Sequence, residues 1–320
     1  MDTRAPDTGT NSTGLPPEPD AAVRIRGLRK AYGGVTAVDG IDLDIAQGET
    51  FALLGPNGAG KSTTVEILEG YRLRTAGEVS VLGVDPAHGD LDWKARLGIV
   101  LQSATESGVY TVREQLAHFA GFYPDPRDID EVIAAVGLES KARTRISKLS
   151  GGQRRRVDVA LGIIGRPELL FLDEPTTGFD PEARREFWNL IRSLKAEGTT
   201  ILLTTHYLDE AENLADRVGV IAAGRLLAVD TPEALGGRSA EEATVSWEEN
   251  GIRRSLTTST PTAEVARLAA GMSGGEVPAL TVTRPSLEDT YLTMIAPHVG
   301  HDAHDAHDAH DAHDATEVPA

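Results

Sequence analysis

A glycine-rich stretch between an apolar run and a helical run constrains the fold of this chain more than any other feature. It reads Gly55-Pro-Asn-Gly-Ala-Gly-Lys-Ser62 and matches the pattern of a phosphate-binding loop. The run from Phe51 to Leu54 has the length of a short buried strand, and Lys61 to Glu69 reads as a helix closed by Gly70. Strand, loop and helix in this order begin a parallel α/β unit.

The stretch is suited to a bound nucleotide. Its glycines let backbone N–H groups turn inward onto phosphates, and the N-terminus of the next helix adds a partial positive charge. We expect Lys61 to reach the β- and γ-phosphates of ATP and Ser62 to ligate Mg²⁺. A glycine-rich turn without a ligand is the alternative, which the flanking strand and helix disfavour. The predicted ATP-binding residues of the loop are Gly55, Pro56, Asn57, Gly58, Ala59, Gly60, Lys61, Ser62 and Thr63.

Two acidic residues end a second apolar strand, Leu169-Leu-Phe-Leu-Asp-Glu174. Their carboxylates should emerge at the carboxyl edge of a parallel sheet, where ligands bind. Asp173 suits the Mg²⁺ shell, and Glu174 suits a base that polarises the attacking water. A capping role for this pair is the alternative, but Pro181 places the start of the next helix near Asp180.

Apolar and polar patterns organise the rest of the chain. Apolar runs at 201–204 and 218–222 alternate with helical stretches and predict further parallel strands. Residues 37–45 alternate like a half-buried strand, whereas 111–165 read as helices that open with a capping box. Beyond these, short alternating pieces and one helical stretch at 263–270 indicate a small α+β unit.

These patterns predict an α/β fold of the P-loop NTPase kind. The patterns indicate a parallel sheet core, a helical insert and a small C-terminal α+β appendage. The resemblance of the loop to that of P-loop NTPases implies that the core is RecA-like and that it carries an antiparallel β subdomain. The polar, proline-rich beginning and the repetitive end indicate disordered tails. The predicted boundaries are a tail at 1–22, an ATPase domain at 23–238 with its insert at about 103–165, an accessory domain at 239–297 and a tail at 298–320.

The string Leu149-Ser-Gly-Gly-Gln-Arg154 narrows the class further. Together with the loop and the acidic strand end, it makes residues 23–235 resemble the ATPase subunits of ABC transporters. A serine and two glycines at a helix N-terminus offer a hydroxyl, bare amides and a dipole to an anion. A flexible turn is the alternative. The resemblance implies contact with the γ-phosphate of ATP held by an opposite subunit, through Ser150, Gly151, Gly152 and Gln153.

Four single positions acquire roles from the same resemblance. Tyr32 corresponds to an aromatic residue that stacks on adenine, and Gln102 to a glutamine that senses Mg²⁺ and the attacking water. Asp180 corresponds to an aspartate that reports across the dimer, although Phe179 stands where leucine is commoner. His206, after an apolar run, corresponds to a histidine that contacts the γ-phosphate and orients the catalytic glutamate. Packing for the tyrosine and a structural role for the histidine are the alternatives.

The resemblance therefore completes the set of expected site residues. The predicted catalytic residues are Glu174, His206 and Gln102, and the predicted Mg²⁺ ligands are Ser62, Gln102 and Asp173.

Composition limits the partners. The formal net charge is −18 and aromatic residues make up 5%, so recognition of a nucleic-acid backbone or of stacked bases is not expected. The absence of cysteine excludes disulfides and thiolate zinc sites. No apolar run is long enough to span a membrane, and no signal-peptide pattern opens the chain. A role at a membrane would therefore require a spanning partner.

The C-terminal end repeats His-Asp-Ala from His301 to Ala315. In a helix this period drifts by about 60° per repeat, and in polyproline II neighbouring rings stand about 9 Å apart. The imidazoles therefore do not converge on one preformed site. Weak binding of Zn²⁺, Ni²⁺ or Cu²⁺ is one interpretation of the repeat, and a solvated segment without a core is the other.

Three further segments, 174–181, 204–211 and 285–291, resemble the exporter branch that contains the daunorubicin-resistance ATPases. The resemblance implies ATP and Mg²⁺ as cofactors, a second copy of the cassette, and a separate membrane permease for a drug, antibiotic, lipid or similar compound. It also implies a peripheral position on the cytoplasmic face of the cell membrane. A non-transport ABC ATPase acting on nucleic acid or ribosomes is the alternative, which would need coiled-coil arms, a second cassette or a basic patch.

Overall fold

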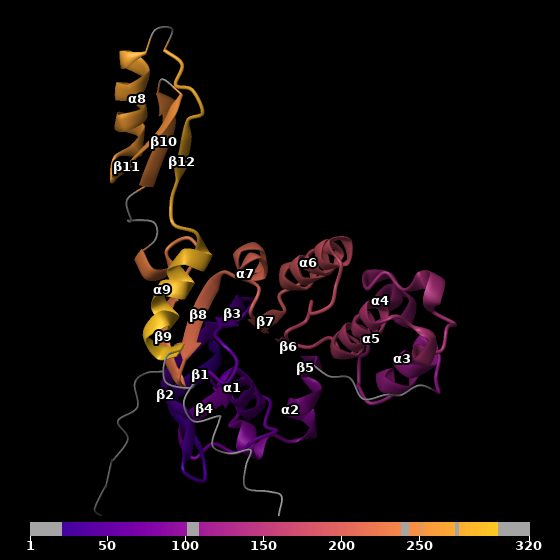
Figure 1. The fold of residues 1–320 in the computed structure, drawn as a ribbon. Coiled ribbons are helices and arrows are strands. Elements are labelled where there is room, and N and C mark those ends of the chain that lie inside the picture. Colours follow the sequence, from indigo (N-terminus) through magenta and orange to yellow (C-terminus); the bar gives the residue numbers. More distant parts are fainter. Residues whose placement is uncertain (1–20, 101–108, 238–242, 250, 273–274, 300–320) are drawn as a thin grey trace, which may run out of the picture.

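A six-stranded sheet forms the centre of the molecule in the computed structural model, which describes residues 21–100, 109–237, 243–249, 251–272 and 275–299 (Figure 1). The strand order is β5-β6-β7-β3-β8-β9. All neighbours are parallel except β8 and β9, so the predicted parallel core is confirmed and an antiparallel strand is added at one edge. The strands are β3 (Thr50–Leu54), β5 (Leu97–Val100), β6 (Leu169–Asp173), β7 (Thr200–Thr205), β8 (Arg217–Ala222) and β9 (Arg225–Asp230).

The central strands are apolar because both of their faces are covered. Every residue of β3 and β7 is buried, as expected for parallel strands between two layers. On β6, Leu170 and Leu172 pack in the cluster that includes α5 and α6, whereas Leu169 and Phe171 pack in the cluster that includes α1 and the antiparallel sheet. This sheet, in order β2-β1-β4, comprises β1 (Ala21–Tyr32), β2 (Val35–Ala46) and β4 (Ala76–Val81).

The first strand begins earlier than the predicted tail boundary. Ala21 pairs with Ala46, and Ala22 is fully buried. These two residues were placed in the tail because the apolar pattern is clear only from Val23 onward. The remaining residues of the predicted N-terminal tail, 1–20, and the His-Asp-Ala repeats lie outside the described residues.

Helices cover the sheet and form a separate group beyond β5 in Figure 1. The helical insert contains α3, α4 and α5, which we call the helical subdomain. Its first helix begins with the predicted capping box between Thr111 and Glu114. The helices are α1 (Lys61–Leu68), α2 (Leu91–Ala95), α3 (Val112–Ala120), α4 (Ile129–Ala135), α5 (Gly151–Ile163), α6 (Pro181–Ala196), α7 (Leu208–Leu214), α8 (Pro261–Gly271) and α9 (Leu287–Val299). Short 3-10 turns span Pro86–His88, Glu139–Lys141, Ile146–Lys148 and Leu235–Gly237.

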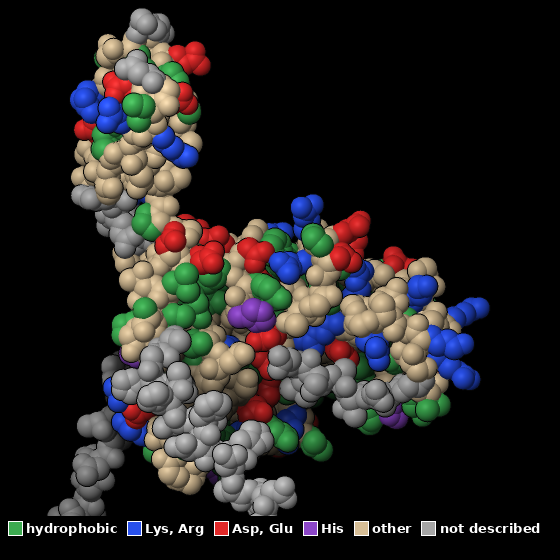
Figure 2. Space-filling view, viewed as in Figure 1, with side chains coloured by type: hydrophobic (Ala, Val, Ile, Leu, Met, Phe, Trp, Pro, Cys, Tyr) green, Lys and Arg blue, Asp and Glu red, His purple; other side chains and the backbone are tan. Residues whose placement is uncertain are grey.

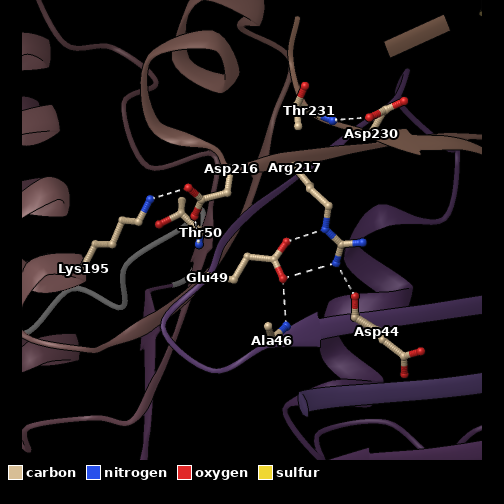
Figure 3. Close-up of polar contacts among 9 residues, drawn as sticks. All are labelled: Asp44, Ala46, Glu49, Thr50, Lys195, Asp216, Arg217, Asp230 and Thr231. Atoms are coloured by element: carbon tan, nitrogen blue, oxygen red, sulfur yellow. Dashed lines mark hydrogen bonds and ion pairs between the residues drawn. The ribbon is translucent and has the colours of Figure 1, made fainter. Parts of the chain in front are cut away.

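A polar cluster at the amino end of the sheet joins it to β2 (Figure 3). Arg217 donates through Nε to Glu49 Oε1 at 2.8 Å and through Nη2 to the carbonyl oxygen of Asp44 at 2.5 Å. Beside it, Asp216 pairs with Lys195 from α6. Because these contacts lie at the end opposite to the carboxyl ends of the strands, they stabilise the scaffold and leave the other edge for ligands.

The C-terminal region is divided differently from the predicted accessory domain at 239–297. A three-stranded sheet, in order β11-β10-β12, and α8 form a C-terminal lobe that projects from the rest of the molecule (Figure 1). Its strands are β10 (Ala243–Glu249), β11 (Ile252–Thr258) and β12 (Thr281–Thr283). Helix α9 instead packs on the ATPase domain, where Leu287 and Ile295 join the same buried cluster as Leu214 and Val218. The lobe is therefore inserted before α9.

In the part of the chain that the structure describes, no helix is both long and apolar enough to cross a membrane.

Candidate nucleotide site

The glycine-rich loop between β3 and α1 is pressed against neighbouring backbone on one side and open on the other. A Cβ on Gly55 would lie 2.3 Å from the carbonyl oxygen of Ile221, and one on Gly60 would lie 2.4 Å from that of Ala37. Gly58 has a φ of +78° and open space around its missing Cβ. Glycine is therefore required where the loop meets β2 and β8, and the opposite side is free to receive phosphates.

Lys61 is buried at the start of α1 and turned onto the loop. Its Nζ donates to the carbonyl oxygens of Gly55 at 2.7 Å and Pro56 at 3.1 Å. Burial lowers the pKa of Lys61, and the nearby carboxylates of Glu174 and Asp173 partly oppose this effect. The two carboxylates do not fully offset the cost of burying this ammonium group. A phosphate that enters the loop would add negative charge beside it.

Oxygen ligands for a divalent cation occur beside this lysine. The hydroxyl of Ser62 is on an exposed residue in the first turn of α1, and the carboxylate of Asp173 ends β6. Mg²⁺ prefers one or two such oxygen ligands together with phosphate and water. The residues therefore fit the ion. The third predicted ligand, Gln102, lies outside the described residues.

The end of β6 is joined to β7 through Thr204. Its Oγ1 donates to Asp173 Oδ1, and the N–H of Glu174 donates to the carbonyl oxygen of Thr204 at 3.1 Å and to its Oγ1 at 3.2 Å. Glu174 adopts a φ of +45°, a left-handed conformation that is uncommon for a residue other than glycine. The two acidic residues are thus fixed by the neighbouring strand.

His206 follows β7 and lies against Glu174. Its Nδ1 is 3.2 Å from Glu174 Oε1, and Thr177 Oγ1 donates to Glu174 Oε2 at 3.5 Å. The imidazole ring contacts the ring of Tyr207 in a tilted arrangement, with ring centroids 4.1 Å apart. Because Nδ1 faces the carboxylate and the side chain is 44% exposed, Nε2 is the nitrogen available to a ligand.

Tyr32 ends β1 and is 39% exposed. Two cationic groups approach the ring: Lys30 Nζ is 4.8 Å and the guanidinium carbon of Arg72 is 5.6 Å from the centroid. The ring therefore has exposed surface for stacking, and stacking on adenine remains a prediction for this residue.

Two other predicted residues are N-caps of helices. Ser150 is the N-cap of α5 and forms a capping box with Gln153, with N···O distances of 3.2 Å in both directions. Asp180 caps α6 by accepting from the N–H of Ala183 at 2.8 Å. The chain thus brings together Lys61 with the ends of β6 and β7. Contact of Ser150 and Asp180 with another subunit remains a prediction.

Sequence reasoning missed two residues that hold the chain at the end of β6. Thr204 was assigned only to an apolar strand, and Arg155 was not separated from its two neighbouring arginines. The structure shows that Arg155 donates to the carbonyl oxygens of Asp173 and Pro175. The sequence offered two signals. Thr204 is a polar residue in the otherwise apolar run at 201–204, and Arg155 is an arginine at a buried helical position.

Glu69, at the C-terminal end of α1, predicts a measurable pH dependence of stability. Burial raises the pKa of Glu69 from 4.5 to about 8, with smaller contributions from Asp173 and Glu66. The folded chain holds this proton more tightly than the unfolded chain does. This carboxyl's contribution is therefore fully present below about pH 4.5 and lost as pH rises towards 8.

Between about pH 5 and pH 8, we expect the free energy of unfolding to fall less for Glu69→Gln than for the parent. The two decreases should differ by on the order of a few kcal/mol. Urea unfolding at both pH values measures it. The same change at the exposed Glu139 should leave the parent's pH dependence intact. Parallel pH profiles for the parent and Glu69→Gln would contradict the burial effect.

Comparisons with known proteins agree with this geometry. The family profile described as ABC transporter matches residues 38–177. Nod factor export ATP-binding protein I of Rhizobium johnstonii is 46% identical over 220 residues, covering 67% of this chain and 70% of that protein. Daunorubicin resistance ATP-binding protein DrrA3 of Streptomyces coeruleorubidus is 41% identical over 221 residues, covering 68% and 70%.

Solved structures show the same fold. The cbiO1 structure from Clostridium perfringens, described as part of the ABC transporter complex cbiONQ, matches with a TM-score of 0.61 and 29% identity, covering 67% of this chain and 90% of that one. A dimeric ATP-binding cassette in a post-hydrolysis state with ADP and Pi matches with a TM-score of 0.60 and 24% identity, covering 65% and 98%. This chain therefore belongs to the ATP-binding, ATP-hydrolysing subunits of ABC transporters, among relatives of the exporter type.

Proposed function

We propose that the chain hydrolyses ATP at a site completed by a second copy of itself, and that this drives export through a separate membrane permease. The observation that supports a shared site is that two phosphate-binding elements lie at the starts of different helices, α1 and α5. Lys61 lies with Asp173, Glu174 and His206, whereas the capping box at Ser150 begins α5 in the helical subdomain. Figure 2 shows Lys and Arg side chains gathered over this subdomain, which suits an approach to phosphates held by a partner.

Each residue of the group has a distinct task in this proposal. Lys61 holds the phosphates, and Glu174 accepts a proton from the attacking water. His206 fixes the direction of the Glu174 carboxylate through Nδ1 and offers Nε2 to the γ-phosphate. Ser62 and Asp173, with Gln102 as a further predicted ligand, would hold Mg²⁺, which would neutralise charge on the phosphate oxygens. Tyr32 stacks on the base.

The names of the relatives support a separate permease and an exported compound. Those relatives are named for Nod factor export and for daunorubicin resistance. We infer that this chain serves export of a compound such as a drug, antibiotic or lipid, while bound peripherally to its permease at the cytoplasmic face of the membrane.

A pair of defined heterodimers tests the shared site. One pairs a Lys61→Ala chain with a Ser150→Ala chain, which gives one intact site and one site with both defects. The other pairs the double variant with the parent, so each site lacks one group. Because the number of substitutions is equal, a stability defect affects both heterodimers alike.

Only the first heterodimer should occlude ATP, measured as radiolabelled ATP retained by differently tagged, purified heterodimers after rapid dilution. Equal retention by both, or better retention by the second, would show that each site is built within one chain.

A further inference from the structure

Arg155 holds the backbone on both sides of Glu174. It lies on α5 and is buried, with 7% of its surface exposed. Its Nε donates to the carbonyl oxygen of Pro175 at 3.1 Å, and its Nη2 donates to that of Asp173 at 2.6 Å. Because a guanidinium presents its donors in a rigid plane, one side chain fixes two peptide groups around the glutamate.

Glu174 needs this support because its backbone conformation is unfavourable. A φ of +45° is uncommon for a residue with a side chain, and Pro175 further restricts the residue before it. Thr204 accepts from the N–H of Glu174, while Arg155 donates to the carbonyl oxygen of the same peptide group. That peptide is thus held at both ends. The direction of the Glu174 side chain depends on both contacts.

The charge of Arg155 is costly at this position. Burial lowers the pKa of its guanidinium, and the carboxylates of Asp158, Asp173 and Glu210 partly oppose this effect. Glu210, on α7, is itself fully buried. An apolar side chain would fill the same space without such a desolvation cost. The hydrogen bonds to the two carbonyl oxygens explain why an arginine stands there.

We propose that Arg155 is the positioning residue for the catalytic glutamate, holding Glu174 where its carboxylate can accept a proton from the attacking water. This inference rests on the proposed role of Glu174 as the base. A misplacement of about 1 Å in a reacting group can lower a rate by about 10²-fold. Loss of both hydrogen bonds releases the segment that keeps the carboxylate in place.

Substitution of Arg155 in the full-length chain should separate kcat from KM. We expect Arg155→Met to lower kcat about 10- to 100-fold and to leave the KM for ATP within about twofold, since Lys61 is held by the loop itself. Arg155→Lys keeps the charge, but one ammonium does not reproduce the planar fork. It should restore the melting temperature and recover kcat only in part.

Arg127→Met is the matched control for loss of a largely buried arginine. The side chain of Arg127 is 16% exposed and pairs with Glu197, the C-cap of α6. Its kcat should equal that of the parent. Full recovery of kcat by Arg155→Lys, or a higher KM with unchanged kcat in Arg155→Met, would overturn the positioning role.

A double-mutant cycle with Glu174→Gln isolates the coupling. Measured by quenched turnover of radiolabelled ATP at high protein concentration, Arg155→Met should cause no further loss once the glutamate has been replaced. An equal loss in both backgrounds overturns the inference. Full turnover by Glu174→Gln alone overturns the proposed function and this inference together. A normal loss in Glu174→Gln with unchanged kcat in Arg155→Met overturns only this inference.

Discussion

Replacement of Glu174 by glutamine is expected to lower ATP turnover by about 10²- to 10⁴-fold, the usual contribution of a general base. Glutamine keeps the shape of the side chain but does not accept a proton. The contacts that bind phosphate belong to the loop and to Lys61, which the substitution leaves in place. ATP should therefore bind with nearly normal affinity, and an ATP-bound dimer should accumulate. Phosphate release and size-exclusion chromatography with ATP measure the two effects.

Glu186→Gln is the control for the loss of one carboxylate. Glu186 lies on α6, is more than half exposed and pairs with Arg156 away from β6 and β7. Its turnover should match that of the parent. Parent-like turnover by the Glu174 variant would remove this residue from its proposed role.

Replacement of Lys61 by alanine should weaken ATP binding by about 10- to 100-fold, the range expected for losing a hydrogen bond to a charged group. The ammonium already lies inside the loop, where it donates to two carbonyl oxygens. Binding of a labelled nucleotide by equilibrium dialysis measures the change. In contrast to the Glu174 variant, this one should not accumulate an ATP-bound dimer.

Lys195→Ala provides the comparison for loss of a lysine. Lys195 pairs with Asp216 at the amino end of the sheet (Figure 3). Because this pair lies at the end of the sheet opposite to the ligand edge, ATP affinity should be unchanged. A surface pair of this kind also contributes little to stability. Equal affinities of the Lys61 variant and the parent would show that the loop alone binds the phosphates.

The parts of the site that depend on neighbouring residues could be predicted from the sequence. The loop after β3 and the acidic end of β6 are each set by a few consecutive residues. The contacts of Thr204 with Asp173 and of Arg155 with Asp173 join residues 31 and 18 positions apart. Such contacts depend on strand order and on the rotation of α5, which local patterns do not specify.

The packing of α9 was not visible in the sequence. This helix places few buried apolar side chains on the ATPase domain, chiefly Leu287 and Ile295, and Pro297 lies near its end. A pattern this weak does not reveal which surface a helix covers. The lobe, by contrast, was recognisable from Thr244 to Glu248 and from the helical stretch at 263–270, because alternation and helical periodicity are local.

Insertion of the lobe before α9 has a consequence for how the molecule can be dissected. A chain cut after residue 238 would lose the helix that covers Leu214 and Val218, and it would present that apolar surface to water. Excision of residues 243–283 with a short flexible bridge would keep α9 on the cassette. The lobe can thus be removed as a unit, whereas α9 belongs structurally to the ATPase domain on which it packs.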